Sequence, residues 1–550
     1  MTALRARNYD LRTRRDVILA FVLLVSSALL RFWGLKWGLP NELHDYSYHP
    51  DEFLTVGTAL AIAFLGRVWN PGFYNYPSLY PYMCAVVLAF MGAFVGELSS
   101  ASAYLSARII SAAIGTAAVL AVFWAGSALY DKRIGLLAGT ILCVAPLHVQ
   151  HSHFAAVDVP STLFVALALG FSARILRQRR IQDYLLAGSA AGLAAGTKYN
   201  AGLVLLSPIA AHLLQSDQRK DGSMSWELLG MLLCAVVAFL VSTPGSVSDT
   251  SAFVHGVLYE LRHSASGHGL VFAGTGSGFV YTFRHSIIPG LGIILACLFF
   301  ISIIAVLAVR DRPGLTLAAF VIPYYGAVSM SQVRFARYIL PILPAVAILI
   351  AWTAFDRWRK LCNIETVDWL IRMSLRALCL VGIVVALVAS ASLNVAQSGS
   401  DPRDEAARWV FAHIPKGSII GVVDWPWFYS PPYTRAVGFG TLPQRQESTR
   451  KTPYQIVVLV SRSDIWRPLP RWVVMSDYEI EDALRLADCR TLSGEQRRRV
   501  ALINRAVSVV RRNYRCRAVF GGSGGLVDWQ KLPHDMRYTN PRITIYELRK

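Results

Sequence analysis

The sequence predicts an all-α polytopic membrane protein that carries a C-terminal α/β domain outside the membrane. Of its 550 residues, 54% are hydrophobic, and the mean hydropathy is +0.42, which is unusually apolar for a soluble chain of this length. Several apolar runs approach or exceed the ~18–20 residues that cross a bilayer. After about residue 397, strand-like and helix-like patterns alternate instead.

The apolar runs predict about eleven transmembrane helices. The first run ends in Arg31-Phe32-Trp33, without the small residues of a signal-peptide cleavage site. It is therefore predicted to be an uncleaved transmembrane span. The candidate spans are residues 17–35, 104–128, 134–150, 158–173, 184–197, 201–215, 226–243, 287–309, 314–330, 338–355 and 374–396.

The basic residues between the spans predict the orientation in the membrane. If the N-terminus is cytoplasmic, every basic cluster between spans falls on the cytoplasmic side, as the positive-inside rule requires. This holds only if residues 77–98 do not cross. Segments 53–66 and 77–98 are therefore expected to be surface helices within a long first outer loop.

The formal net charge of +20 is explained by these loop clusters and by contact with anionic lipids. The sequence contains no nucleic-acid-binding motif and no continuous basic face, so a nucleic-acid partner is not expected.

The composition divides the chain into a membrane domain, residues 1–396, and an outer α/β domain, residues 397–550. Cys489 and Cys516 of the outer domain would be able to form a disulfide in an oxidising compartment. Its expected helices are 401–414 and 493–514, and its expected strands are Ile419–Val423, Ile456–Val460, Val473–Met475, Ala518–Phe520 and Ile543–Glu547.

Two adjacent carboxylates, Asp51 and Glu52, follow the first span. Carboxylates this close to a bilayer cost free energy unless they are solvated or paired with a cation, and those that are retained often have a functional role. Neighbouring helical residues do not face each other, so the two are expected to have different roles, one of them as a general base. The alternative interpretation is a solvated pair that caps a helix beginning at Phe53.

The same topology places further polar residues on the outer face. Asp158 follows three histidines, His148, His151 and His153, which are either a metal cluster or ordinary interfacial residues. A group of cations on this side, where anchoring positive charges are rare, suits a phosphate or pyrophosphate. These cations are Arg108, Lys198 (beside Tyr199), Arg334 and Arg337, the last two sharing a face if residues 332–340 are helical.

The outer loop at residues 244–286 is rich in glycine and histidine and is expected to be mobile enough to close over a substrate. It contains no phosphate-binding GxxxxGK[ST] motif. Because this loop offers no site for nucleotide phosphates, an activated substrate at the outer face would have to arrive on a lipid.

Several of these motifs, in this order, resemble the GT-C glycosyltransferases, within the superfamily of protein O-mannosyltransferases and aminoarabinose transferases. The matching segments are HPDE at 49–52, the Tyr76-Pro77 to Pro81 stretch, Ala107-Arg108-Ile109, HSHFAAVDVPSTLF from 151, GLAAGTKYNAGLVLL from 192 and RFARYILPILP from 334. In the outer domain, DPRDEAARWVFAHIPKGS and NPRITIYELRK are similar to bacterial members.

The resemblance implies a sugar donor on a polyprenyl phosphate and transfer to an unknown acceptor at the outer face of a bacterial inner membrane. It implies catalytic roles for Asp51, Glu52 and Asp158, and phosphate contacts by Arg108 and Lys198. Relatives often carry Lys or His beside the proline at 77, where this chain has Tyr76 and Ser78.

The expected reaction is a single displacement with inversion at the anomeric carbon. No cofactor is required, since lipid phosphate is a competent leaving group. A divalent metal is possible, with His49 and Glu52 as ligands, while His151, His153 and Tyr199 are expected in supporting positions. The alternatives are a transporter or flippase for a lipid-linked or anionic substrate, and a non-catalytic envelope assembly protein.

Overall fold

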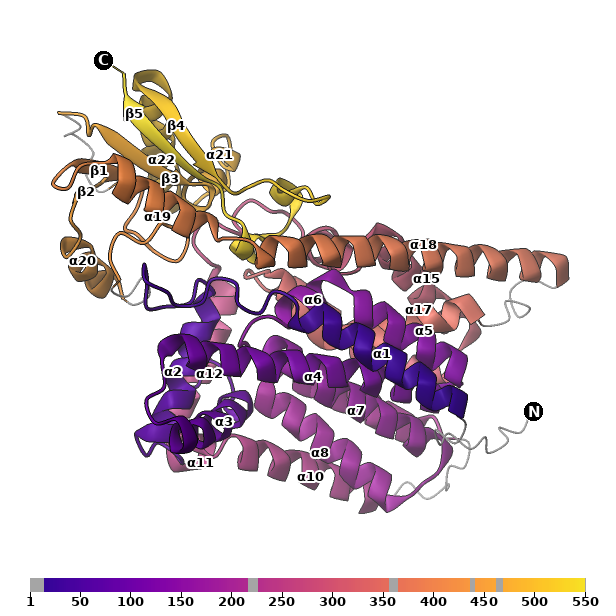
Figure 1. Cartoon of the computed structure of the whole chain (residues 1–550). Coiled ribbons are helices and arrows are strands. Elements are labelled where there is room, and N and C mark those ends of the chain that lie inside the picture. The colour runs from indigo at the N-terminus through magenta and orange to yellow at the C-terminus, as the bar shows by residue number, and fades with distance from the viewer. Residues whose placement is uncertain (1–13, 216–225, 356–364, 436–440, 461–467, 550) are drawn as a thin grey trace.

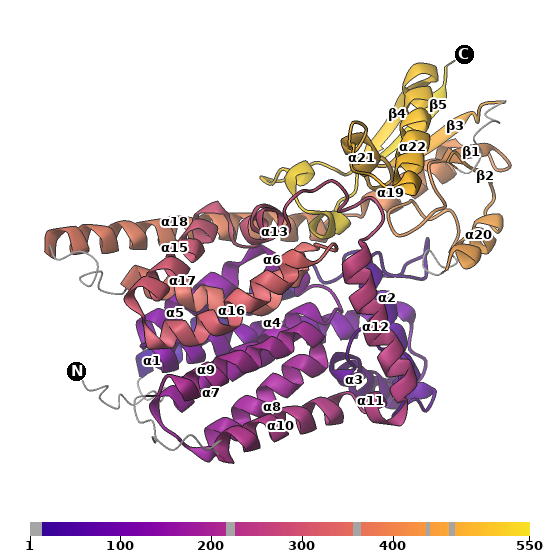
Figure 2. The ribbon, with the colours of Figure 1, turned by 180° about the vertical axis from the view of Figure 1, so that it is seen from behind.

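The computed structural model describes residues 14–215, 226–355, 365–435, 441–460 and 468–549. A bundle of apolar helices carries a group of peripheral helices at one end, and a sheet domain lies over the same end (Figure 1). The view from behind shows the peripheral helix α12 standing beside α2 and α3 (Figure 2).

The bundle is built mainly from helices of the first 400 residues. Its elements are α1 Arg14–Phe32, α4 Ser100–Leu129, α5 Lys132–Val144, α6 Pro146–His151, α7 Asp158–Arg177, α8 Ile181–Thr197, η1 Tyr199–Leu205, α9 Leu206–Leu213, α10 Trp226–Ser242, α13 Gly278–Thr282, η2 Phe283–Ile287, α14 Ile288–Leu291, α15 Ile293–Val309, α16 Arg312–Met330, η3 Ala336–Ile342, α17 Leu343–Phe355 and α18 Glu365–Ser398. The peripheral helices are α2 Pro50–Phe64, α3 Leu79–Val95, α11 Gly245–Ser248 and α12 Thr250–Ser266.

Small residues bring neighbouring bundle helices into close contact. A Cβ added at Gly188 or Gly192 of α8 would lie 2.0 or 2.2 Å from a backbone carbonyl oxygen of α10. Because lipid tails are as apolar as leucine, close backbone packing of this kind, rather than the hydrophobic effect, holds membrane helices together.

Length and composition identify five helices of the described chain as able to cross a membrane, or six if one bent pair counts as a span. These are Ser100–Leu129, Asp158–Arg177, Arg312–Met330, Ala336–Phe355 and Thr366–His413, with the pair Gly278–Leu291 and Ile293–Val309 bent by 118°. Helices cover the eleven expected segments, but several are shorter, so the count of eleven stays a prediction. So does the surface position of α2 and α3.

The expected strands of the C-terminal region are confirmed within a few residues. The sheet order is β2-β1-β3-β5-β4, with β1 parallel to β2 and β3, and β5 antiparallel to β3 and β4. The elements are α19 Pro402–His413, β1 Ile419–Val422, α20 Leu442–Arg450, β2 Gln455–Val458, β3 Trp472–Ser476, α21 Asp477–Arg485, α22 Gly494–Asn513, β4 Tyr514–Phe520, η5 Trp529–Lys531, η6 His534–Thr539 and β5 Ile543–Leu548. Cys489 and Cys516 are both free thiols, so the structure does not contain the disulfide considered above.

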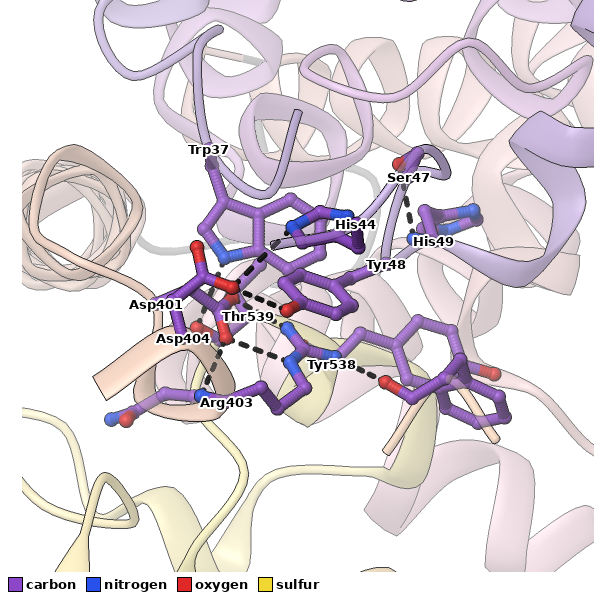
Figure 3. Close-up of polar contacts among 12 residues, drawn as sticks. Trp37, His44, Ser47, Tyr48, His49, Asp401, Arg403, Asp404, Tyr538 and Thr539 are labelled. Atoms are coloured by element: carbon purple, nitrogen blue, oxygen red, sulfur yellow. Dashed lines mark hydrogen bonds and ion pairs between the residues drawn. The ribbon is translucent and has the colours of Figure 1, made fainter. Parts of the chain in front are cut away.

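A buried arginine fastens the sheet domain to the loop between α1 and α2. Arg403 of α19 is fully buried, pairs with Asp401 at 2.6 Å and donates to the carbonyls of Phe428 and Tyr538, each at 2.8 Å (Figure 3). Its guanidinium lies 3.8 Å from the ring centre of Tyr48.

Further contacts complete this junction. The Tyr48 hydroxyl donates to Asp404 at 2.5 Å, and the Trp37 indole donates to the Thr539 carbonyl at 3.2 Å (Figure 3). The loop that leads directly to Asp51 is therefore held by the outer domain.

Candidate active site

The two acids of the first outer loop point in different directions because they begin a helix. Pro50 occupies the first turn of α2, where its missing N–H costs nothing, and the His49 ring nitrogen Nδ1 accepts from the Asp51 N–H at 3.3 Å. Consecutive helical residues are separated by about 100° of rotation. Asp51 consequently lines a cavity, whereas Glu52 turns into the protein and is fully buried.

Glu52 forms a buried ion pair with Arg108. Its two carboxylate oxygens accept from Arg108 Nε at 2.8 Å and Nη2 at 2.7 Å, and one of them also accepts from the Ala155 N–H at 2.7 Å. The pair joins the first loop, α4 and the segment before α7.

Arg108 differs from the expectation of a phosphate contact. Its Nη1 donates to the Leu35 and Trp37 carbonyls, and its Nη2 also donates to the Ser47 hydroxyl. With the two bonds to Glu52, all five guanidinium N–H groups are engaged. In this structure Arg108 has no donor left for a lipid phosphate and serves to hold Glu52.

Replacing Arg108 by alanine should destabilise the fold, because it leaves the Glu52 carboxylate buried without its partner. The expected loss is about 3–5 kcal/mol, measured as a fall in the thermal unfolding midpoint of the purified protein. Arg408 pairs with Glu42 at 3.1 Å, but both side chains are more than half exposed. Arg408→Ala is the matched control and should barely move the midpoint. Equal shifts for both variants would contradict a structural role of Arg108.

Arg337 lies at the centre of the site, surrounded by three carboxylates. Its guanidinium nitrogens are 3.1 Å from Asp51 Oδ2, 3.5 Å from Asp535 Oδ2 and 4.0 Å from Asp158 Oδ2. Lys198 Nζ is 2.5 Å from the other oxygen of Asp158. Two cations and three acids from distant parts of the chain thus form one cluster.

Aromatic rings support the two cations. The Arg337 guanidinium lies 4.0 Å from the ring centre of Phe335, and Lys198 Nζ lies 4.9 Å from that of Tyr338. Cation–π contacts stabilise a positive charge without neutralising it, so both side chains remain able to attract an anion.

Several polar atoms near this cluster are buried and have no hydrogen-bond partner among the described residues. They are His49 Nε2 and both ring nitrogens of His151, while Asp51 Oδ2 and Arg337 Nη1 have only the ion-pair contacts given above. Buried polar groups in folded proteins are almost always hydrogen-bonded. Their concentration here marks a place where a polar ligand or water would be bound.

The cluster opens into a cavity of about 660 Å³. This volume is typical of a site for a ligand of sugar or drug size. Asp51, Glu260 and Arg337 are its charged residues. Its lining comes from both parts of the chain: Pro50, Phe53, Leu54, Phe73, Tyr76, Tyr259, Phe335 and Tyr338 from the membrane part, and Trp427, Phe428, Tyr429, Tyr478, His534 and Tyr538 from the outer domain.

The cavity raises the pKa of the carboxyl groups that line it. Burial raises the pKa of Glu260, on the peripheral helix α12, to about 7, and the neighbouring Asp51 adds to the effect. Burial also raises the pKa of Asp51, while Arg337 opposes the rise. A carboxylate with a raised pKa is a stronger base than one in water.

Arg334 does not share a helix face with Arg337. Residues 332–335 are not helical, and the 3₁₀ helix η3 begins only at Ala336. Arg334 donates instead to Thr275 Oγ1 at 2.8 Å and to the Gly276 carbonyl at 2.9 Å. It therefore braces the glycine-rich turn at Thr275 and Gly276 rather than lining the cavity.

The histidines before Asp158 are dispersed. His148 contacts Arg31 at 2.8 Å, and the His153 ring contacts the Trp33 carbonyl at 2.7 Å, so His151 alone of the three approaches the acids. Tyr199 donates to the Tyr74 carbonyl at 2.8 Å, outside the cavity lining.

Within the described ranges, no three His, Cys, Asp or Glu side chains are grouped as metal ligands. Both oxygens of Glu52, one of the two ligands considered above, accept from Arg108.

Asp535 and Glu260 are functional candidates that sequence reasoning missed. Asp535 accepts from the backbone N–H groups of Ala336 and Arg337, at 3.1 and 2.9 Å. No motif surrounds it, so nothing in the sequence singles it out. Glu260 is the only acid between His255 and His285, and that isolation was an available signal.

An acid–cation cluster at the end of an apolar helical bundle, beneath an α/β domain, is the arrangement that the resemblance to GT-C glycosyltransferases implies. The family model described as dolichyl-phosphate-mannose-protein mannosyltransferase matches residues 81–243. No curated protein matches the sequence.

Two solved structures are similar to this chain, and the first of them indicates its fold. ArnT from Cupriavidus metallidurans, bound to undecaprenyl phosphate, matches with a TM-score of 0.51 and 17% identity over 97% of this chain and 98% of that one. AglB from Archaeoglobus fulgidus, in complex with an inhibitory peptide and a dolichol-phosphate, matches with a TM-score of 0.48 and 14% identity over 86% of this chain and 71% of that one. The chain therefore shares the fold of ArnT, and its apolar helices make it a multi-pass membrane protein.

Proposed function

We propose that this protein is an inverting glycosyltransferase that uses a sugar carried on a polyprenyl phosphate, at the outer face of a bacterial inner membrane. The observation that carries the proposal is the contact between Asp51 and Arg337 in the wall of a 660 Å³ cavity. A base and a cation side by side are what a displacement needs when the leaving group is a phosphate.

In the proposed reaction Asp51 takes the proton of an acceptor hydroxyl. The acceptor oxygen then bonds to the anomeric carbon while the bond from that carbon to the phosphate oxygen breaks. Polyprenyl phosphate leaves with the electron pair, and Arg337 stabilises its charge. One displacement inverts the anomeric configuration.

Asp158 and Lys198 support this arrangement. Asp158 is almost fully buried and contacts both Lys198 and Arg337, so it fixes the two cations relative to each other. Lys198 pairs with the same Asp158 that Arg337 contacts, so it adds positive charge to the site proposed for the phosphate. We assign Asp158 as a positioning residue rather than the base.

The proposal is tested with purified protein and a panel of polyprenyl-phosphate sugars that differ in the sugar. Release of polyprenyl phosphate, accompanied by transfer or hydrolysis of the sugar, supports it. Intact donor with every sugar contradicts it. Movement of a donor across a vesicle bilayer without cleavage would indicate a flippase.

The pH dependence of donor binding should follow Glu260. Its pKa of about 7 means that it is mostly neutral at pH 6 and negatively charged at pH 8. The added negative charge repels an anionic phosphate, so the apparent KM for donor should rise about threefold between these pH values. In Glu260→Gln the rise should disappear.

His268 also lines the cavity, but burial lowers its pKa to about 4. It stays neutral between pH 6 and 8 and is not expected to contribute. An unchanged pH slope in Glu260→Gln would contradict the assignment to Glu260.

A further inference from the structure

A second cavity lies between the C-terminal domain and residues 268–271, and it adjoins the first. Its volume is about 600 Å³, and it shares five lining residues with the Asp51 cavity: His268, Val271, Trp427, Tyr429 and Tyr478. The second cavity therefore lies beside the one that Asp51 lines.

The sheet topology explains why a cavity forms at this place. After β1 the chain passes through α20 to β2 on one side, and after β3 it passes through α21 and α22 to β4 on the other side. The carboxyl ends of β1 and β3 therefore border the point at which the connections diverge. In open α/β sheets this point is where ligands bind. Asp424 and Trp425, which follow β1, line the cavity together with Glu479 from the first turn of α21.

The cavity combines aromatic rings with charged side chains. Trp425, Trp427, Tyr429 and Tyr478 contribute rings, and the Tyr429 and Tyr478 rings are parallel within 5°. Asp424 pairs with Arg499 at 2.5 Å, and Arg445 lies 4.7 Å from the ring centre of Trp427.

This chemistry suits a saccharide. A sugar ring presents flat C–H faces to aromatic rings, and each hydroxyl both donates and accepts, so it can use a carboxylate and a guanidinium in turn. One common way to bind an extended peptide is to add it as a strand along a sheet edge. The cavity opens at strand ends, where no such row of backbone groups is offered.

We propose that the second cavity binds a saccharide portion of the acceptor and directs one of its hydroxyls toward Asp51. This inference rests on the proposed transferase function for its role, but binding of the saccharide is a separate observable. The acceptor would thus be a glycan or a glycolipid headgroup, with protein acceptors as the competing outcome.

The test is saturation-transfer NMR on the full-length protein in nanodiscs, with methyl glycosides of hexoses, pentoses, amino sugars and uronic acids as probes. Saccharide signals are expected with the wild type, and Asp424→Asn or Trp425→Leu should raise the dissociation constant at least about fivefold. Asp528→Asn, which removes the partner of Lys531 in another part of the domain, is the matched control.

The outcomes separate the two proposals. Absence of binding by every saccharide, or equal binding by wild type and both variants with unchanged melting midpoints, overturns the acceptor site. Transfer to a Ser/Thr peptide with none to a saccharide also overturns it. Saccharide binding that depends on Asp424, together with no donor cleavage by the wild type, leaves the site standing and removes the transferase function.

Discussion

Asp51→Asn is expected to reduce the rate of sugar transfer by at least about a hundredfold, the contribution of a positioned general base. Asparagine keeps the size of the side chain but cannot take a proton. Donor binding should be unchanged or tighter, because the substitution removes a negative charge 3.1 Å from Arg337. Single-turnover release of polyprenyl phosphate measures the rate, and equilibrium binding of the donor measures the affinity.

Asp45→Asn is the matched control for this prediction. Asp45 belongs to the same loop and pairs with Arg435 at 3.1 Å, but both of these side chains are more than half exposed. Its transfer rate should stay near that of the wild type. Near-normal transfer by folded Asp51→Asn would show that another group is the base.

Arg337→Lys should lower transfer by about a hundred- to a thousandfold, comparable to the loss of one preorganised donor at a developing oxyanion. Lysine keeps the positive charge among Asp51, Asp158 and Asp535 but lacks the planar fork that reaches all three. It is preferable to alanine, which would leave three buried acids without their common partner. Kinetics with a labelled lipid donor and the thermal unfolding midpoint separate chemistry from folding.

Arg334→Lys is the matched control for Arg337→Lys. Arg334 lies three residues earlier but contacts the turn at Thr275 and Gly276. Arg334→Lys is expected to have a much smaller effect on donor cleavage. If the two variants lost activity equally, Arg337 would have no special position relative to the phosphate.

The sequence predicts much of the fold because local patterns determine it. β-Branched runs mark the strands at Ile419 and Val473, and Ser493 with Gln496 forms a capping box at the start of α22. The face expected from charge sidedness included Asp51, Asp158, Lys198 and Arg337, which the structure brings together, but also Arg108 and Arg334, which bond elsewhere.

Other features depend on tertiary contacts that no local pattern contains. The helical face expected to carry Arg334 and Arg337 fails because η3 begins at Ala336, where Asp535 of the outer domain accepts the first two N–H groups. Asp535 acts there as a helix cap supplied from about two hundred residues away. Similarly, the aromatic walls of the cavity come from separate loops, and single aromatic residues in loops carry no signal of a shared site.

The Arg403 junction limits how this protein can be recombined with its relatives. An exchange of C-terminal domains cut near residue 397 would separate Arg403 and Asp404 from Trp37 and Tyr48. The buried Trp37 N–H and the Tyr48 hydroxyl would then lack their acceptors. A working chimera would have to transfer the first loop together with the outer domain. The structural unit that an exchange must move is therefore discontinuous in sequence, and it includes the loop that ends at Asp51.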